Sequence, residues 1–434
     1  MLKYLLLILS LCFASASAIQ AKTRIVFWHS MGGQLGVILN HLVKEFNDSQ
    51  HQYVVDAIYK GQYAESLTST VAAFHAHKAP DLVQVFEVGT ATMLSSKAAI
   101  VPVYRLMKDN NIPLSSQQFF PAIGGYYSNT KGQLMAFPFN SSSPVLYYNK
   151  EAFRMAGLNP NKPPKTWPQL EADSKQLLKA GYQCGFTTAW PSWIQLEVFS
   201  AWHNKPFATQ GNGLLGNNPR VKFNYPLLVK HIATLGRWQK EHIFEYGGQE
   251  SNAIALFETG VCPMITDSSG ALASLSKTVK FPLAVGYLPY WPADGVPQNT
   301  SIGGAALWVM AGHSKHEYKG IAEFLQFLAK AKIQAYWSEK TGYLPVTMAA
   351  YNYIKNQGYY QRHPNQEIAI KELNHKPPTR YSKGIRLGNY SLIRKINSSA
   401  IEAVMSQQMT AKQALDKAVK EDNLLLEQFH LSIQ

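Results

Sequence analysis

Hydrophobic and polar positions follow two different periods in the first part of the chain. Apolar, β-prone runs at 23–29, 53–59 and 81–86 predict strands. Apolar side chains that recur at helical spacing in 33–48 and 64–76 predict helices. The order strand, helix, strand, helix, strand is typical of a parallel sheet with right-handed crossovers. The pattern therefore predicts an α/β unit in this part of the chain.

A second α/β unit is predicted over 151–300. Helical periodicity covers 167–180, with Thr166 as the expected N-cap residue, and the short apolar run 262–266 predicts a strand. Beyond this unit, 303–310 predicts a further strand, whose two leading glycines can absorb backbone changes. The chain therefore contains two sheet-forming units of similar type.

The stretch 139–150 connects these two units. Four polar side chains at 140–143 precede the apolar run 145–148, which predicts a strand. Polar side chains beside a buried strand are costly unless they are hydrogen-bonded. Two interpretations remain open: a turn with local side-chain to backbone hydrogen bonds, or a polar, ligand-facing crossover between two lobes.

Several segments carry a resemblance that covers the chain from residue 25 to residue 394. The stretch FNSSSPVLYYNK resembles the lobe-crossing segment of the extracellular solute-binding proteins of ABC importers, in the maltose-binding-like group. Within that group, the order of nine segments resembles the members that bind sn-glycerol-3-phosphate. The segments are IVFWHSMGGQLG (25–36), YKGQY (59–63), QVFEVGTATM (84–93), GYYS (125–128), PPKTW (163–167), WIQLEVFSAW (193–202), GGAALWVM (303–310), KTGYLPVT (340–347) and KGIRLGNYSLIR (383–394).

This resemblance implies an α/β, two-lobed periplasmic binding protein fold of type II, the maltose-binding-like type. It also implies three lobe crossings, near 139–145, 302–308 and 343–347. Glycines at the second and third crossings suit a hinge. The implied lobes are an N-terminal lobe of residues 22–139 plus 308–343 and a C-terminal lobe of residues 144–302 plus 347–434.

The resemblance also implies which residues contact a ligand. Arginine supplies a two-pronged donor to a phosphate, a carboxylate accepts from glycerol hydroxyls, and aromatic rings pack the carbon skeleton. The positions that match the family's ligand contacts are Tyr63, Glu87, Ser142, Trp190, Ser268, Gly304, Tyr343 and Arg394.

Other interpretations of these residues stay open. Arg394 could pair with an internal carboxylate, Glu87 could be a first-turn acid favoured by a helix dipole, and the aromatic residues could be ordinary core. One departure from the family's pattern is Asp267, at a position where the family more often has a small residue. Its carboxylate would lie near a bound phosphate and would affect the preference between monoester and diester.

Composition excludes several classes of protein. A hydrophobic content of 46% with a charged content of 16% fits a globular protein with sizeable cores. The formal net charge of +14 is compatible with nucleic acid, a membrane surface or an acidic ligand. Because Lys and Arg are scattered, with no run of four, we expect no nucleic-acid partner.

The N-terminal residues 1–21 have the pattern of a secretory signal peptide. A charged start, an apolar run and small residues precede possible cleavage after Ala18 or Ala21. We therefore expect a cleaved signal peptide and a periplasmic location. In that oxidising compartment Cys184 and Cys262 could form a disulfide or remain buried thiols.

Catalytic and metal-binding motifs are not found in the sequence. There is no H-E-x-x-H, G-x-S-x-G or P-loop, and the G-x-G-x-x-G match at 211–216 lacks the flanking strand and helix of a dinucleotide site. His, Cys and acidic residues have no convincing metal spacing. We therefore expect no enzyme activity, no cofactor and no metal.

The resemblance completes the functional expectation. It implies the periplasmic binding component of an ABC transporter for sn-glycerol-3-phosphate and glycerophosphodiesters such as glycerophosphocholine. A monomer would deliver the ligand to two membrane permease subunits driven by a cytoplasmic ATPase. Three alternatives remain: a sugar- or oligosaccharide-binding protein of the same fold, a secreted phosphodiesterase, and a structural or adhesive protein.

Overall fold

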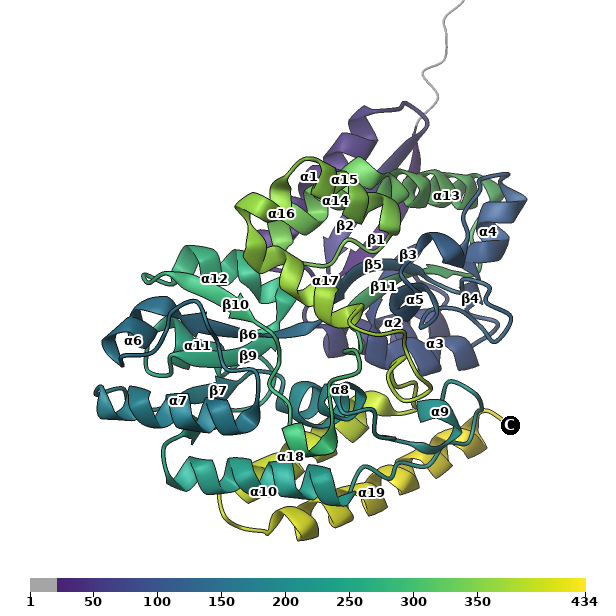
Figure 1. The fold of residues 1–434 in the computed structure, drawn as a ribbon. Coiled ribbons are helices and arrows are strands. Elements are labelled where there is room, and N and C mark those ends of the chain that lie inside the picture. Colours follow the sequence, from purple (N-terminus) through teal and green to yellow (C-terminus); the bar gives the residue numbers. More distant parts are fainter. Residues whose placement is uncertain (1–21) are drawn as a thin grey trace, which may run out of the picture.

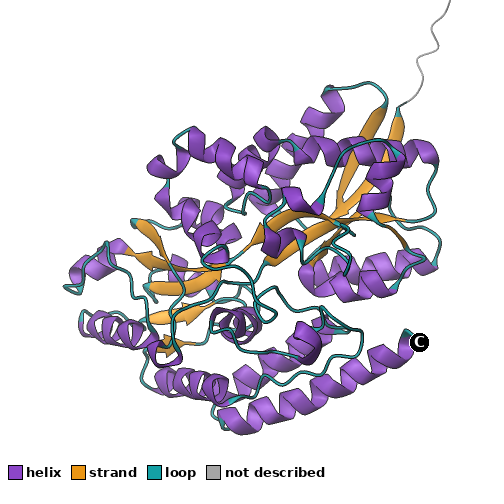
Figure 2. Ribbon diagram, turned by 45° about the vertical axis from the view of Figure 1, so that its right-hand side comes forward, coloured by secondary structure: helices purple, strands orange, loops and turns teal. Residues whose placement is uncertain are grey.

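The computed structural model describes residues 22–434 and has two sheets, each covered by helices (Figures 1 and 2). The predicted signal peptide, 1–21, lies outside the described residues. The strands are β1 (Thr23–His29), β2 (Tyr53–Tyr59), β3 (Leu82–Phe86), β4 (Ile100–Val101), β5 (Phe137–Ser142), β6 (Pro144–Asn149), β7 (Phe186–Thr188), β8 (Phe244–Glu245), β9 (Met264–Ser268), β10 (Leu283–Gly286) and β11 (Gly303–Met310).

Helices make up most of the rest of the chain. They are α1 (Gly33–Asp48), α2 (Tyr63–His75), α3 (Thr90–Ser95), α4 (Val103–Asp109), α5 (Pro121–Gly124), α6 (Lys150–Met155), α7 (Trp167–Lys179), α8 (Phe199–Trp202), α9 (Thr209–Asn212), α10 (Pro226–Lys240), α11 (Ile254–Glu258), α12 (Leu272–Thr278), α13 (Lys315–Ala329), α14 (Ala331–Thr341), α15 (Met348–Asn356), α16 (Tyr359–Arg362), α17 (Ile368–Leu373), α18 (Tyr390–Met405) and α19 (Ala411–Ser432).

The first sheet has the strand order β2-β1-β3-β11-β4, with β5 also paired to β11. As predicted, β1 is parallel to β2 and β3. Strand β11, for which no direction was predicted, is antiparallel to β3, β4 and β5. The reason is topological: β11 returns from the second half of the chain, so no crossover helix sets its direction.

The second sheet has the order β10-β6-β9-β7-β8. Strand β6 is antiparallel to β9 and β10, while β7 is parallel to β8 and β9. The strand predicted at 262–266 is β9, displaced by two residues because Pro263 precedes its first ladder position. The two sheets give the two-lobed architecture that the resemblance implies.

Residues 140–142 are strand and not a turn, which corrects one of the two interpretations, and Ser143 links β5 to β6. Strand β5 runs through Ser142, and its side chains bond to other elements. Asn140 Oδ1 accepts from Gln84 Nε2 at 2.7 Å, and Ser143 Oγ lies 2.6 Å from Thr300 Oγ1. For Asn140 and Ser143, the hydrogen bonds that offset burial therefore come from distant residues.

Helix ends follow the local sequence. Thr166 caps α7 by accepting from the Gln169 N–H at 3.2 Å, as predicted. Residues 193–202 begin as a π-helix, Trp193–Val198, and continue as α8. This irregular turn lies beside the cavity described below, where π-helical segments are often found.

Cys184 and Cys262 form a disulfide, with their Cα atoms 4.9 Å apart. The bond joins the segment before β7 to the segment before β9 in the second sheet. Both residues are buried. Of the two possibilities that the sequence left open, the structure has the disulfide.

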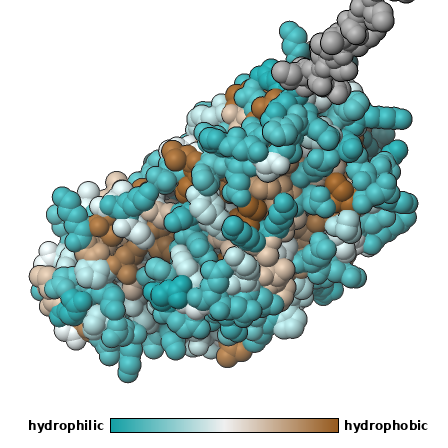
Figure 3. All heavy atoms as spheres, turned by 90° about the horizontal axis from the view of Figure 1, so that it is seen from above, coloured by the Kyte–Doolittle hydropathy of each residue, from teal (hydrophilic) through white to brown (hydrophobic). Residues whose placement is uncertain are grey.

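The surface in Figure 3 is mostly hydrophilic, with scattered apolar residues. In the described part of the chain, no helix combines the length and the apolar character that crossing a membrane requires.

Candidate functional site

A cavity of about 330 Å³ lies where elements of both sheets meet. All eight residues that the sequence singled out line it, although they come from eight separate segments of the chain. They are Tyr63, Glu87, Ser142, Trp190, Ser268, Gly304, Tyr343 and Arg394.

The first lobe contributes an aromatic wall and an acid. Tyr63, the first residue of α2, stacks on Phe86 with ring centres 5.3 Å apart. Its hydroxyl accepts from Asn140 Nδ2 at 2.8 Å. Glu87 directly follows β3 and is buried. A strand end thus places a carboxylate and an aromatic platform on the same side of the cavity.

Strands β5 and β11, which pair side by side in the first sheet, form the floor of the cavity. Ser142 ends β5 opposite Gly303 of β11, with Gly304 beside it. Gly304 has a φ of +90°, and a Cβ there would overlap the carbonyl oxygen of Asn140. The position therefore requires glycine, and the backbone rather than a side chain faces the cavity.

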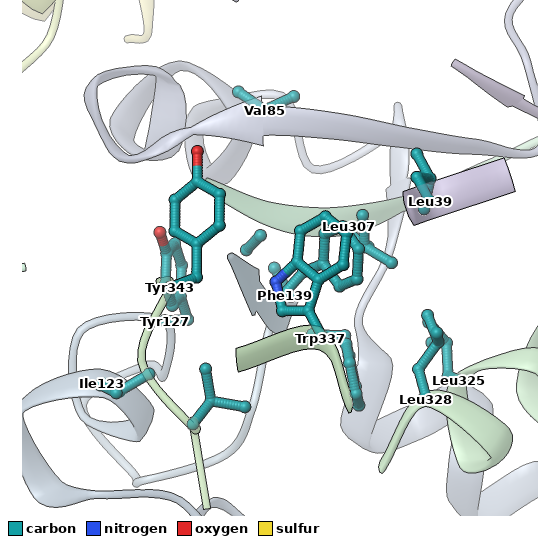
Figure 4. Packing of buried hydrophobic residues seen from close by; sticks show 14 of the residues in the cluster. Leu39, Val85, Ile123, Tyr127, Phe139, Leu307, Leu325, Leu328, Trp337 and Tyr343 are labelled. Atoms are coloured by element: carbon teal, nitrogen blue, oxygen red, sulfur yellow. The ribbon is translucent and has the colours of Figure 1, made fainter. Parts of the chain in front are cut away.

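Ser268 and Tyr343 line the opposite side. Ser268 ends β9, and its hydroxyl accepts from the Gly270 N–H at 3.1 Å. Tyr343 follows α14 and stacks on Trp337, with ring centres 5.8 Å apart (Figure 4). A Cβ at Gly270 would lie 2.9 Å from the Tyr343 ring, so the absence of a side chain there lets the ring pack directly against the Gly270 backbone.

Trp190 is held in an unusual backbone conformation, with a φ of +48°. Its N–H donates to the Glu250 carbonyl at 2.5 Å. Left-handed backbone is rare for a large residue, and such outliers concentrate at functional sites. Trp193, at the start of the π-helix, adds a second indole to the same wall.

Arg394 forms the charged centre of the cavity. It projects from α18, and its guanidinium grips Glu197 with two hydrogen bonds, Nε–Oε1 at 2.8 Å and Nη2–Oε2 at 2.6 Å. The same Nη2 lies 2.7 Å from Glu87 Oε1. The internal carboxylate that the sequence left open as a partner of Arg394 is therefore present, and Glu87 is an ion-pair partner and not a solitary acceptor.

Burial and charge act against each other in this cluster. Burial would lower the pKa of Arg394, but Glu197 and Glu87 raise it well above its ordinary value. Burial raises the pKa of Glu87, and Arg394 opposes that rise. The guanidinium thus stays charged. Among the described residues, no hydrogen bond occupies its Nη1, which is left to donate to a ligand.

Asp267 also lines the cavity, next to Ser268. It is buried, and burial raises the pKa of its carboxyl to about 7, partly offset by a hydrogen bond from the Ser268 N–H at 2.6 Å. Within residues 22–434 it has no ion-pair partner. The carboxyl can therefore be neutral or charged near neutral pH.

Glu197 was missed by reasoning from the sequence. It lies in the run Trp193–Val198, whose other residues are apolar except for Gln195, and a single acid in such a run is a signal that could have identified it. Its carboxylate holds the arginine in position, which is the role expected of a supporting residue behind a binding site.

Several known proteins are similar to this chain. The sn-glycerol-3-phosphate-binding periplasmic protein UgpB of Yersinia pestis is 48% identical over 97% of both chains. The protein of the same name from Salmonella typhimurium is 47% identical over 99% of this chain and 98% of its own.

Solved structures show the same fold. UgpB from Mycobacterium tuberculosis in complex with glycerophosphocholine superposes with a TM-score of 0.78 at 20% identity, covering 94% of this chain and 99% of its own. Maltose-bound MalE3 of T. maritima gives a TM-score of 0.74 at 17% identity, with 93% and 100% covered. This confirms the two-lobed, maltose-binding-like fold.

The family model described as bacterial extracellular solute-binding protein matches residues 41–365. Together with relatives that are nearly half identical along almost the whole chain, this match confirms the family resemblance found in the sequence. The chain belongs to the bacterial extracellular solute-binding proteins.

Proposed function

We propose that this protein is the periplasmic binding component of an ABC importer for sn-glycerol-3-phosphate and for glycerophosphodiesters such as glycerophosphocholine. The observation that carries the proposal is the convergence of eight residues, matched on sequence alone, on one cavity around Arg394. Relatives that are 47–48% identical are named as sn-glycerol-3-phosphate-binding proteins, which supports the same ligand class.

The cavity offers suitable chemistry for such a ligand. Arg394 Nη1 and the hydroxyls of Ser142 and Ser268 are donors for phosphate oxygens. Neutral hydroxyl donors matter here because two carboxylates, Glu197 and Glu87, already pair with the arginine charge. The ring of Trp190 can pack against the carbon skeleton.

The proposed mechanism is lobe closure. Ligand contacts from both lobes favour the closed arrangement and shift an open–closed equilibrium. The closed protein would deliver the ligand, as a monomer, to two permease subunits driven by a cytoplasmic ATPase. Nucleic acid has no part in this proposal.

We also propose the lobe boundaries that the resemblance implied. Residues 22–139 plus 308–343 would form the N-terminal lobe, and 144–302 plus 347–434 the C-terminal lobe. The division of the strands between two sheets supports this. One segment departs from this division: α15 packs on α14, and Tyr351 contacts Phe120 with ring centres 6.1 Å apart, so α15 lies against the N-terminal lobe.

A sugar ligand is the second candidate. The indoles of Trp190 and Trp193 suit a sugar ring, and the carboxylates suit its hydroxyls. Against it, a neutral sugar would give the donors around Arg394 no anion. The phosphodiesterase alternative is set aside, because the relatives and the matching family are named as binding proteins.

Calorimetric titration of the mature protein tests the proposal. We expect binding of sn-glycerol-3-phosphate or glycerophosphocholine, and none of maltose. Ser142→Ala should weaken binding at least tenfold, because a hydroxyl facing the ligand is lost. Ser141→Ala is the matched control, since Ser141 is adjacent, buried and not part of the cavity wall. Binding of maltose alone would overturn the proposal.

A further inference from the structure

A second cluster of polar side chains lies at the far end of the first sheet. Asp81 precedes β3, while His313 and Glu317 lie between the end of β11 and the first turn of α13. One ligand atom from each of the three lies within 4.8 Å of the others. Glu87 follows the opposite end of β3, so the length of that strand separates this cluster from the cavity.

Each of these side chains is oriented through its other polar atom. Asp81 Oδ2 accepts a backbone N–H of β1 at 2.8 Å. His313 Nε2 lies 3.1 Å from the carbonyl oxygen of Pro80, and Glu317 Oε2 accepts the Ser314 N–H at 2.6 Å. Outer hydrogen bonds of this kind fix the ring and carboxylate orientation of metal ligands. They leave Asp81 Oδ1, His313 Nδ1 and Glu317 Oε1 available.

The facing atoms of Asp81 and His313 are both acceptors when the imidazole donates from Nε2 to Pro80. Asp81 Oδ1 and His313 Nδ1 lie 3.2 Å apart. The Asp81 side chain is only 5% exposed, and its Oδ1 receives no hydrogen bond from any residue in 22–434. Two acceptors at this distance repel each other, and an unpaired buried carboxylate oxygen is costly. Something positive must lie between them, either a proton or a cation.

We propose that Asp81, His313 and Glu317 bind a divalent transition-metal ion, with Zn²⁺ the best match. Imidazole nitrogen and carboxylate oxygen are ligands that zinc accepts. With both bonds near 2.0–2.1 Å, a 3.2 Å separation corresponds to an angle of about 100° at the metal, close to tetrahedral. The third ligand is a carboxylate oxygen of Glu317, which lies within 4.8 Å of the other two ligand atoms and moves toward the ion while Oε2 keeps the Ser314 N–H bond. Water supplies the fourth ligand.

The ion fastens three segments of the first lobe. The pairing of Leu82 with Val309 brings the start of β3 beside the end of β11. Gly312, with a φ of +98°, then turns the chain, and His313 directly precedes the N-cap residue of α13. The His313 side chain is 16% exposed, so an ion reaches it from solvent. Spacing along the sequence could not indicate this site, because Asp81 is far from the other two residues.

Calorimetric titration of the chelator-treated mature protein with ZnCl₂ tests the proposal. We expect one zinc ion per chain, bound at least ten times more tightly than by His313→Ala or Glu317→Gln. Two variants are used so that a folding defect in one does not decide the result, and circular dichroism checks that both are folded. The matched control is His316→Ala, which removes an exposed histidine of α13, next to Glu317, and should leave the zinc affinity unchanged.

Thermal unfolding gives a second readout. Zinc should raise the Tm of the wild type and of His316→Ala but not that of His313→Ala, since only a bound ion shifts the unfolding equilibrium. Equal zinc affinity in wild type and His313→Ala would overturn the proposal by placing the ion on surface histidines. An absence of zinc binding would also overturn it and leave a proton shared between Asp81 and His313.

Discussion

The guanidinium of Arg394 and the carboxylate of Glu87 meet at 2.7 Å between Nη2 and Oε1, although α18 and β3 pack in different cores. Glu197 holds the same arginine from within its own lobe, through two hydrogen bonds. One guanidinium therefore links the lobes and is kept in place before a ligand arrives. Such preorganisation reduces the cost of ordering a side chain on binding.

The support that Glu197 gives to Arg394 can be measured. Glu197→Gln should lower the free energy of unfolding by about 2 kcal/mol, because the buried guanidinium loses the charge-assisted hydrogen bonds of one of its two carboxylate partners while Glu87 remains. Urea unfolding monitored by tryptophan fluorescence measures this. Glu427→Gln is the control, because its ion pair with Arg220 is solvent-exposed and should change stability by less than about 1 kcal/mol. Equal losses of unfolding free energy in Glu197→Gln and Glu427→Gln would mean that the buried ion pair stabilises the protein no more than the exposed one.

The disulfide between Cys184 and Cys262 should matter for stability and not for ligand binding. It closes a loop with a sequence separation of 78, for which the chain-entropy model gives about 4.5 kcal/mol. We expect the double variant Cys184→Ala/Cys262→Ala to be less stable in urea unfolding by about 2–4 kcal/mol. Its ligand affinity, measured by calorimetry, should match the wild type, because neither cysteine lines the cavity. An equally stable double variant would contradict this.

Much of the fold could be predicted because local patterns there agree with the tertiary structure. Strands β1 and β2 occupy the predicted residues 23–29 and 53–59, and α1 begins and ends where its glycine and polar residues predict. What could not be predicted depends on distant partners. Strand β5 looks like a turn from its polar residues, and only contacts such as Asn140 with Gln84 explain its extended form.

The candidate site shows the same limit. Its residues could be matched one by one to a family pattern, but the ion pairs among them could not. Glu87 is held by Arg394, a contact between residues more than half the chain apart that no spacing rule encodes. Reading Glu87 as a free acceptor was reasonable from the sequence alone, and the geometry changes its role.

Gly270 should control how closely Tyr343 approaches the ligand. In Gly270→Ala the new Cβ would lie 2.9 Å from the ring of Tyr343, so the ring must shift. We expect ligand affinity to fall about tenfold, which corresponds to about 1.4 kcal/mol. Gly32→Ala is a suitable control, because its Cβ would make only an ordinary 3.4 Å contact with Tyr59 Oη. Unchanged affinity in Gly270→Ala would show that the ring position is not critical.

Asp267 should make ligand binding depend on pH. Burial raises the pKa of this carboxyl to about 7, the Ser268 N–H opposes the rise, and Glu258 adds to it. The phenols of Tyr147 and Tyr343 nearby stay neutral, since burial raises the pKa of both. The carboxyl therefore gains its negative charge as the pH rises through about 7, and a bound phosphate is then repelled.

The appropriate ligand is glycerophosphoglycerol, a diester with a neutral head group, because its own charge is constant in this range. Its affinity should fall up to about tenfold between about pH 6 and about pH 8, and Asp267→Asn should remove this slope. The free energy of unfolding should change with pH in the same direction as the ligand affinity. A carboxyl whose pKa is raised in the folded state stabilises the protein at low pH, and this contribution is lost as the pH rises through about 7.

A control separates Asp267 from another acid whose pKa is raised by partial burial. Burial also raises the pKa of Asp173, to about 6, but this residue lies on α7 and does not line the cavity. Asp173→Asn should therefore keep the wild-type slope of affinity against pH, measured by calorimetry in buffers of matched ionic strength. If Asp267→Asn keeps that slope as well, the titrating group is elsewhere and Asp267 does not face the phosphate. If the slope disappears only in Asp267→Asn, the acid beside Ser268 sets how tightly an anionic ligand is held.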